Sequence, residues 1–277
     1  MFGTELDLRR IEMESNILLV ERKEHDCTLI LNRPEKRNSL SPDLLIEIHQ
    51  TLQALSKDDA VRAIVIRGVG DKAFSSGYDI NAIPTKASPE TQEKFKTQNP
   101  LTLALNSVVN YPYPVIAMLN GSAFGAGCEL AICCDIRIGA EDIRMGMPPA
   151  KLGVVYDPNG LQRFINIIGL SKTKEVFFSG RYYDALSAKE MGLVDHLLPR
   201  SELESFTYNL AEEIAGNAPL AVKGTKRIIN MLVGSARMRD EDMKEAQSII
   251  EQAFNSNDLK EAQASFLEKR KPVFRGR

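Results

Sequence analysis

The sequence contains no tryptophan, few histidines and almost no excess of charge of either sign. Lysine and arginine together number 35 and aspartate and glutamate 37, so the formal net charge is −2. Because no basic block stands out, a nucleic acid is not expected as a partner. The longest apolar runs are too short to cross a bilayer, so no membrane association is expected either.

Cysteine is also scarce, and its spacing matches neither a disulfide framework nor a CxxC motif. The four cysteines are Cys27, Cys128, Cys133 and Cys134, and no histidine clusters with them. This pattern predicts buried free thiols in a reducing cytoplasm and no metal site.

The 277 residues are 43% hydrophobic, which is enough for one large domain or one domain with an appendage. Residues 1–16 mix acidic and basic side chains without an apolar centre, so we expect a polar N-terminal arm rather than a signal peptide. Strand-like and helical patterns alternate over residues 17–200, and helical patterns alone fill residues 201–277. The order predicts an α/β core followed by a C-terminal helical region.

The predicted strands are short runs rich in apolar and β-branched residues: Ile17–Val20, Thr28–Leu31, Ala63–Arg67, Val115–Leu119, Ile136–Ala140 and Val194–Leu198. The predicted helices show helical periodicity: one begun by Ser39 or Ser41 and running to Ser56, then Leu101–Asn110, Cys128–Cys134, Lys172–Phe178, Ser187–Met191, Ser201–Gly216, Pro219–Val233, Arg239–Phe254 and Asp258–Lys269. Ser201 and Glu204 have the spacing of a capping box. Pro84–Asn99 is polar and predicts a solvated segment.

The stretch from Val115 to Asp135 suggests the functional centre. An apolar strand turns through glycines and small residues into a predicted helix whose first turn carries one carboxylate, Glu129. The first amides of a helix have no partner within it and lie at the positive end of its dipole, so they suit an anion or a developing oxyanion. The alternative is a glycine-rich turn in the core with Glu129 on the surface.

Several motifs together give a resemblance that covers the chain from about Ile17 to its C-terminus: RPEKRNSLS, AFSSGYDI, NGSAFGAGCELAICCD, LGVVYDPNG and FLEKRKPVFRG. In combination they resemble the crotonase family, the enoyl-CoA hydratases and isomerases. The resemblance implies a spiral of ββα units and a C-terminal helical trimerisation region. It also implies homotrimers, or hexamers formed as dimers of trimers.

The resemblance further implies an acyl-CoA thioester substrate, with coenzyme A as part of the substrate and no separate cofactor. By position, the backbone amides of Tyr78 and Ala126 would hold the thioester oxygen as an enolate forms. Six residues would contact coenzyme A, the last two from the C-terminal helix: Lys36, Arg37, Ser76, Ile80, Phe266 and Lys269. The alternative for the lysines is an ordinary solvated surface charge.

One departure from the family pattern bears on the reaction. Family hydratases use two glutamates, of which Glu129 matches the first, whereas the second position is Pro149. Family isomerases rely on the second glutamate, so a simple hydratase or isomerase mechanism is weakened. Decarboxylation needs no base, because loss of carbon dioxide forms the enolate directly.

The loop LGVVYD resembles that of the methylmalonyl-CoA decarboxylases within the family, which also have proline at the second position. Tyr156 would bind the leaving carboxylate or supply a proton, or else would be an ordinary core tyrosine. Asp157 would supply a second carboxylate, and the Tyr78 side chain would either narrow the acyl pocket or pack away from it. The sequence therefore favours a decarboxylase of small 2-carboxyacyl thioesters. The alternatives are a hydratase using Glu129, with Asp157 or water, and a non-catalytic relative that binds acyl-CoA or RNA.

Overall fold

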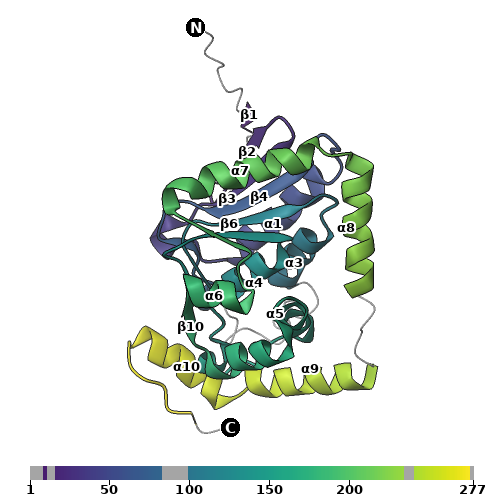
Figure 1. Cartoon of the computed structure of the whole chain (residues 1–277). Helices are drawn as coiled ribbons and strands as arrows, with labels where there is room; N and C mark the ends of the chain where they lie inside the picture. The colour runs from purple at the N-terminus through teal and green to yellow at the C-terminus, as the bar shows by residue number, and fades with distance from the viewer. Residues whose placement is uncertain (1–8, 11–15, 83–98, 234–239, 275–277) are drawn as a thin grey trace.

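The computed structural model describes residues 9–10, 16–82, 99–233 and 240–274 (Figure 1). The segment predicted to be solvated, Pro84–Asn99, lies outside these residues except for Asn99, and so does most of the N-terminal arm. In the part of the chain that is described, every helix is too short or too polar to span a membrane.

Two β-sheets form the centre of the molecule. The larger has the strand order β1-β2-β3-β4-β6-β8-β11 and the smaller the order β10-β9-β7-β5. Their strands are β1 Arg9–Arg10, β2 Leu18–Lys23, β3 Asp26–Leu31, β4 Ala63–Gly68, β5 Ala73–Ser75, β6 Val115–Leu119, β7 Ser122–Phe124, β8 Ile136–Ala140, β9 Arg144–Gly146, β10 Tyr182–Asp184 and β11 His196–Leu198. Strands β2 and β3 pair antiparallel, and β3, β4, β6, β8 and β11 run parallel.

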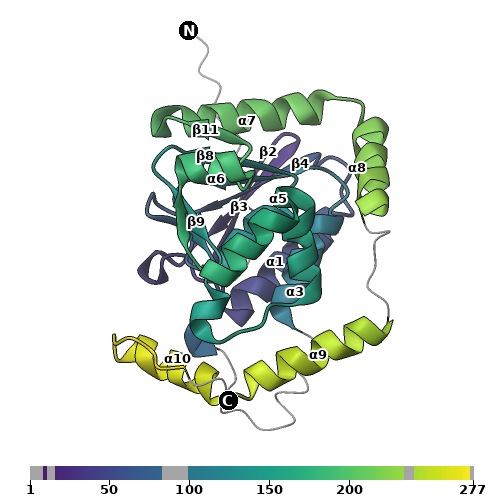
Figure 2. The same cartoon turned by 60° about the horizontal axis from the view of Figure 1, so that its bottom comes forward.

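The helices and short helical turns complete the chain. They are η1 Pro34–Lys36, α1 Pro42–Leu55, η2 Ile80–Ala82, α3 Pro100–Asn110, α4 Ala126–Cys133, η3 Pro149–Leu152, α5 Pro158–Ser179, α6 Ala185–Met191, α7 Arg200–Gly216, α8 Pro219–Val233, α9 Asp240–Phe254 and α10 Asn257–Leu267. Helix α7 covers one face of the larger sheet, and α1, α3 and α4 lie on the opposite side (Figure 1). Helix α8 stands at one side of the molecule, while α9 and α10 lie at the end away from α7 (Figures 1 and 2).

The two sheets are filled alternately along the chain. In each of the pairs β4–β5, β6–β7 and β8–β9, the first strand joins the larger sheet and the second joins the smaller one, before the chain passes into α3, α4 or α5. This alternation is the spiral of ββα units that the resemblance implied. It brings the ends of β5 and β7, which are parallel neighbours, to the same place at the start of α4.

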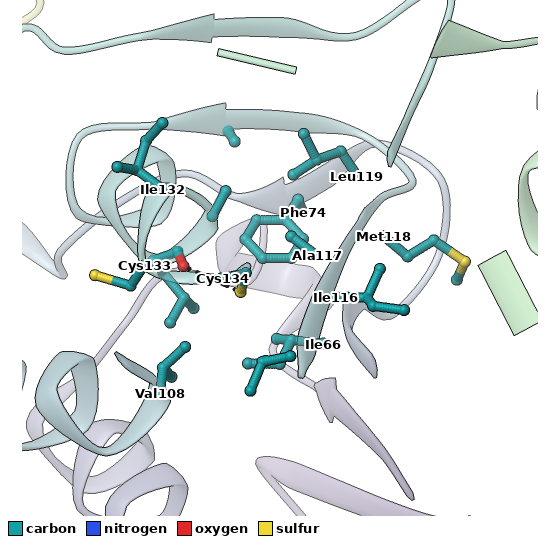
Figure 3. Packing of buried hydrophobic residues seen from close by; sticks show 14 of the residues in the cluster. Ile66, Phe74, Val108, Ile116, Ala117, Met118, Leu119, Ile132, Cys133 and Cys134 are labelled. Atoms are coloured by element: carbon teal, nitrogen blue, oxygen red, sulfur yellow. Dashed lines mark hydrogen bonds between the residues drawn. The ribbon is translucent and has the colours of Figure 1, made fainter. Parts of the chain in front are cut away.

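The core around this point is continuous and apolar. Strand β6 is buried along its whole length, which is typical of a strand covered on both faces. Figure 3 shows the side chains that pack around it: Ile66, Phe74, Val108, Ile116, Ala117, Met118, Leu119, Ile132, Cys133 and Cys134. Because β4, β5, β6, α3 and α4 all contribute, the strand that leads into the glycine-rich turn is held from every side.

Helix starts differ in how well they follow from sequence. Ser41 caps α1 by accepting a hydrogen bond from the Leu44 amide at 3.3 Å, as one of the two predicted serines. The predicted capping box at α7 is wrong, because Pro199 occupies the N-cap position and no side chain caps the helix. Glu204 instead pairs with Arg67 at 3.3 Å, so a contact with β4 replaces the local one.

Candidate active site

Two backbone segments meet at the start of α4. The first is Gly77–Tyr78, two residues after the end of β5, and the second is Gly125–Ala126, directly after β7. A methyl group placed on Gly77 would lie 2.7 Å from the carbonyl oxygen of Phe124 and 3.5 Å from the amide nitrogen of Ala126. Gly77 has a φ of +103° and Gly125 a φ of +51°, so both positions use conformations that favour glycine. The glycines therefore let the two segments approach each other closely.

Neighbouring backbone hydrogen bonds determine the directions of the Tyr78 and Ala126 amides. Tyr78 forms a parallel bridge with Leu40, in which the Leu40 amide donates to the Gly77 carbonyl at 2.8 Å and the Asp79 amide donates to the Leu40 carbonyl at 3.0 Å. Since hydrogen-bonding directions alternate along an extended chain, the Tyr78 amide is directed away from Leu40. Ala126 is the first residue of α4, and its amide is one of those with no acceptor inside the helix.

Glu129 lies one turn into α4 and is 3% exposed. The Tyr156 hydroxyl donates to its Oε2 at 2.5 Å, and Arg163 Nη1 donates to its Oε1 at 2.9 Å. Burial raises the pKa of the Glu129 carboxyl, while the Tyr156 hydrogen bond and the Arg163 charge act in the opposite direction. Burial, helped by the charge of Glu129, also raises the pKa of the Tyr156 hydroxyl. The alternative in which Glu129 lies on the surface is therefore wrong.

Tyr156 and Glu129 pack directly against the start of α5. A methyl group on Gly160 would lie 2.7 Å from Cε1 of the Tyr156 ring and 2.8 Å from Oε1 of Glu129. The ring of Tyr156 also packs against Phe177, with centroids 5.2 Å apart. Glycine at position 160 is thus required sterically, because any larger side chain would displace the carboxylate or the ring.

Arg163 and its second partner were not identified from the sequence. Arg163 Nη2 donates to Oδ1 of Asn106 on α3 at 2.8 Å, so one guanidinium joins α3, α4 and α5. A single carboxylate in an apolar helix does signal the need for a cation. The sequence could not select Arg163 among 35 basic residues, since it stands 34 positions away from Glu129.

Asp157 and Tyr78 are the two other side chains that were predicted for the site. Asp157 is the N-cap of α5, and its Oδ1 accepts from the amides of Asn159 at 2.9 Å and Gly160 at 3.3 Å. Its carboxylate is therefore used to start the helix that carries Arg163. Tyr78 is half-buried and packs against the core, and burial, together with the nearby Asp79 carboxylate, raises its pKa to about 12.

The residues predicted to contact coenzyme A fall into two groups. Lys36 and Arg37 are exposed, and their carbonyls accept hydrogen bonds from Ser76, from its hydroxyl at 3.1 Å and from its amide at 3.0 Å. Ile80 follows in η2, so four of the predicted residues share one surface loop cluster. The other two, Phe266 and Lys269, are exposed at the end of the C-terminal helical region.

Helix α10, which leads to Phe266 and Lys269, packs against η3 and the loop after it. A methyl group on Gly153 would lie 3.1 Å from the amide nitrogen of Leu259, and Gly153 itself has a φ of +64°. The C-terminal helix therefore contacts the loop that carries Tyr156 within the same chain. Within the described residues, no group of three or more histidine, cysteine, aspartate or glutamate side chains is placed to hold a metal ion.

Comparison with known proteins identifies the family of the chain. The family described as enoyl-CoA hydratase/isomerase matches residues 21–277. The chain belongs to this family. Among its enoyl-CoA hydratase/isomerase relatives, the crotonyl-CoA hydratase of Syntrophomonas wolfei is 33% identical over 261 residues, which are 93% of this chain and 97% of the relative.

Solved structures also align over nearly the whole chain. Methylmalonyl-CoA decarboxylase complexed with 2S-carboxypropyl-CoA has a TM-score of 0.88 at 28% identity, with 96% of this chain and all of that chain covered. An enoyl-CoA hydratase from Bacillus anthracis has a TM-score of 0.72 at 30% identity, with 95% and 100% covered. The backbone of this chain is thus more similar to the decarboxylase than to that hydratase, although the sequence identities are close.

Proposed function

We propose that this protein acts on acyl-CoA thioesters and decarboxylates a small 2-carboxyacyl-CoA of the methylmalonyl-CoA type. The observation that carries the proposal is that other side chains hydrogen-bond to the Glu129 carboxylate. Both of its oxygens are taken by Tyr156 and Arg163, and proline stands where family hydratases have their second glutamate. Asp157, the residue considered from the sequence as a second carboxylate, caps α5.

Water addition asks more of a site than decarboxylation does. A water molecule must be positioned and deprotonated while a proton reaches the α-carbon, which is a task for two carboxylates. In decarboxylation, the bond between the α-carbon and the carboxylate breaks, carbon dioxide leaves, and the electron pair forms the thioester enolate. The amides of Tyr78 and Ala126 hold the negative oxygen, and a proton then adds to the α-carbon.

In this proposal, the two backbone amides make the largest contribution to lowering the reaction barrier. Loss of one oxyanion donor typically raises the barrier by about 2.7–4 kcal/mol. Glu129 lies three residues beyond Ala126. We propose that the hydrogen-bonded pair of Tyr156 and Glu129 supplies the proton and forms one wall of the pocket for the substrate carboxylate. The exposed Lys36 and Arg37 would bind the phosphates of coenzyme A, with Ser76 and Ile80 beside them and with Phe266 and Lys269 from the C-terminal helix. Coenzyme A is then part of the substrate, and the reaction as proposed uses no other cofactor.

Hydration is the second candidate function, because the crotonyl-CoA hydratase of S. wolfei is 33% identical and Glu129 is present. The deciding experiment supplies methylmalonyl-CoA, ethylmalonyl-CoA and crotonyl-CoA in parallel. Carbon dioxide release and the decarboxylated thioester are measured for the first two, and loss of the enoyl absorbance for the third. We expect carbon dioxide release that falls strongly in Tyr156→Phe and in Glu129→Gln. Hydration of crotonyl-CoA without any carbon dioxide release would replace the proposal by the hydratase, and tight binding without turnover would favour a non-catalytic relative.

The assembly is proposed to be a homotrimer or a pair of trimers. Helix α8 exposes large apolar side chains, among them Leu220 at 83% and Leu232 at 70%, and such a face is typically covered by a partner. Light scattering is expected to give three or six times the mass of the chain. The free and buried state of all four cysteines supports a reducing compartment, and we propose the cytoplasm.

A further inference from the structure

Arg163 occupies an unusual place for a charged side chain. It extends from the first turns of α5 toward α4, where it meets a carboxylate whose side chain is 4% exposed, and its own side chain is 19% exposed. The same guanidinium reaches Asn106 on α3 at 2.8 Å. Its two terminal nitrogens are therefore directed at two different helices, which fixes the plane of the fork.

The contacts of Glu129 are divided between its two oxygens. Oε1 accepts from Arg163 and Oε2 accepts from the Tyr156 hydroxyl. A carboxylate held at one oxygen by a fixed fork cannot rotate without breaking that bond, so the direction of Oε2 follows from the position of Arg163. Gly160 provides the space in which Oε1 and the Tyr156 ring lie against α5.

Arg163 also balances the negative charge of Glu129. The titratable groups that face Glu129 are Tyr156 and Asp157 from the loop, Arg163 from α5, and the thiols of Cys128 and Cys133 from α4. Of these, only Arg163 carries a positive charge. A buried carboxylate without a cation takes up a proton instead of remaining ionised.

We propose that Arg163 is a positioning residue: it keeps Glu129 ionised and aims Oε2 at the hydroxyl of Tyr156. Arg163 acts through Glu129 and does not itself touch the reacting atoms. The inference rests on the proposed function for its kinetic consequence, whereas its consequence for Glu129 can be measured without any substrate.

The test compares Arg163→Gln, Arg163→Lys and the matched control Lys172→Gln. Lys172 lies on the same helix and donates to the Glu190 carbonyl at 2.8 Å, so its replacement removes a charge from α5 without touching Glu129. The first readout is the infrared band of the protonated Glu129 carboxyl followed against pH, identified by its loss when Glu129→Gln is added. We expect this titration to move to higher pH in Arg163→Gln, to move less in Arg163→Lys, and to stay at the wild-type value in Lys172→Gln.

The second readout is turnover of the acyl-CoA substrate. Misplacement of a reacting group by about 1 Å can cost about 100-fold in rate, so we expect kcat to fall by about that factor in Arg163→Gln while KM changes little. Arg163→Lys should recover part of kcat because it restores the charge. A titration of Glu129 that does not move in a folded Arg163→Gln protein would overturn the inference. A wild-type protein that turns over no acyl-CoA would instead overturn the proposed function, and the infrared titration would still decide the role of Arg163.

Discussion

The Arg33 guanidinium and the Asp79 carboxylate form an ion pair, with Nη2 and Oδ2 3.1 Å apart. The other terminal nitrogen of Arg33 donates to the Ser39 carbonyl at 2.7 Å. Asp79 directly follows Tyr78, whose amide is half of the proposed oxyanion site, while Ser39 lies just after the loop that carries Lys36 and Arg37. One arginine therefore links the proposed coenzyme A loop to the segment that places an oxyanion donor.

Replacement of Asp79 by asparagine is expected to loosen this segment. The two side chains are 15% and 14% exposed, and a hydrogen bond to a charged group contributes about 1.5–3 kcal/mol. We expect a loss of that size in the free energy of unfolding, together with a fall in kcat, measured by urea denaturation and by steady-state kinetics. Lys223→Met is the control, because its pair with Asp59 is far more exposed and exposed ion pairs contribute little to stability. Equal effects of the two variants would contradict the prediction.

Gly77→Ala tests the close approach of the two oxyanion segments. The added methyl group would meet the Phe124 carbonyl at 2.7 Å, in a backbone conformation with φ of +103°. We expect kcat to fall by about 100- to 1000-fold, as when an oxyanion donor is removed. Gly70→Ala is the matched control, since Gly70 also has a positive φ, +73°, but has nothing within 4 Å of the added atom. A Gly70→Ala protein that loses activity as severely would show that backbone strain alone explains the loss.

Gly160→Ala tests the packing of Tyr156 and Glu129 on α5. The added methyl group has no room, so the ring or the carboxylate must shift and the hydrogen bond between them must lengthen. We expect a lower kcat and a cost in stability of about 1–3 kcal/mol from overpacking. In Gly224→Ala, on α8, the added methyl group meets nothing within 4 Å, and the substitution should instead stabilise the protein by about 0.5–1 kcal/mol. Thermal unfolding and kinetics of both proteins separate the steric effect at Gly160 from the general effect of replacing glycine by alanine in a helix.

Alkaline pH should destabilise the protein through its buried thiols. Burial raises the pKa of Cys27 and of Cys128 from 9.0 to about 12. Between these values the unfolded chain has lost protons that the folded chain still holds, so the free energy of unfolding falls as pH rises. Urea denaturation at successive pH values from 8 upward should show this decline beginning near pH 9. In Cys27→Ala the decline should be shallower, and an unchanged slope would count against the assignment.

The sequence predicted those parts of the fold that local patterns encode. The strands around β6 and the N-cap Ser41 were expected because apolar runs and capping residues act within a few positions. The capping box at Ser201 was wrong because α7 starts after Pro199, and Glu204 pairs instead with Arg67, far away in the chain. Residues that meet only through tertiary packing leave no such signal.

The candidate site divides in the same way. Glu129 and the glycine-rich turn were identified from one continuous stretch, and Tyr156 from a resemblance in its loop. Arg163 and Asn106 could not be selected, because their partners stand on other helices and any of several cations would satisfy a lone carboxylate equally well. Asp157 was predicted as a second catalytic carboxylate, but an aspartate directly before a proline is equally suited to cap a helix, and this is the role it has.

The contact between Gly153 and the start of α10 has a consequence for synthesis of the chain. The loop with Tyr156 leaves the ribosome roughly a hundred residues before the helix that supports it, since α10 begins at Asn257. Translation proceeds from the N-terminus and domains form as they emerge. The spiral can therefore begin to assemble while the loop with Tyr156 still lacks the helix that packs against it.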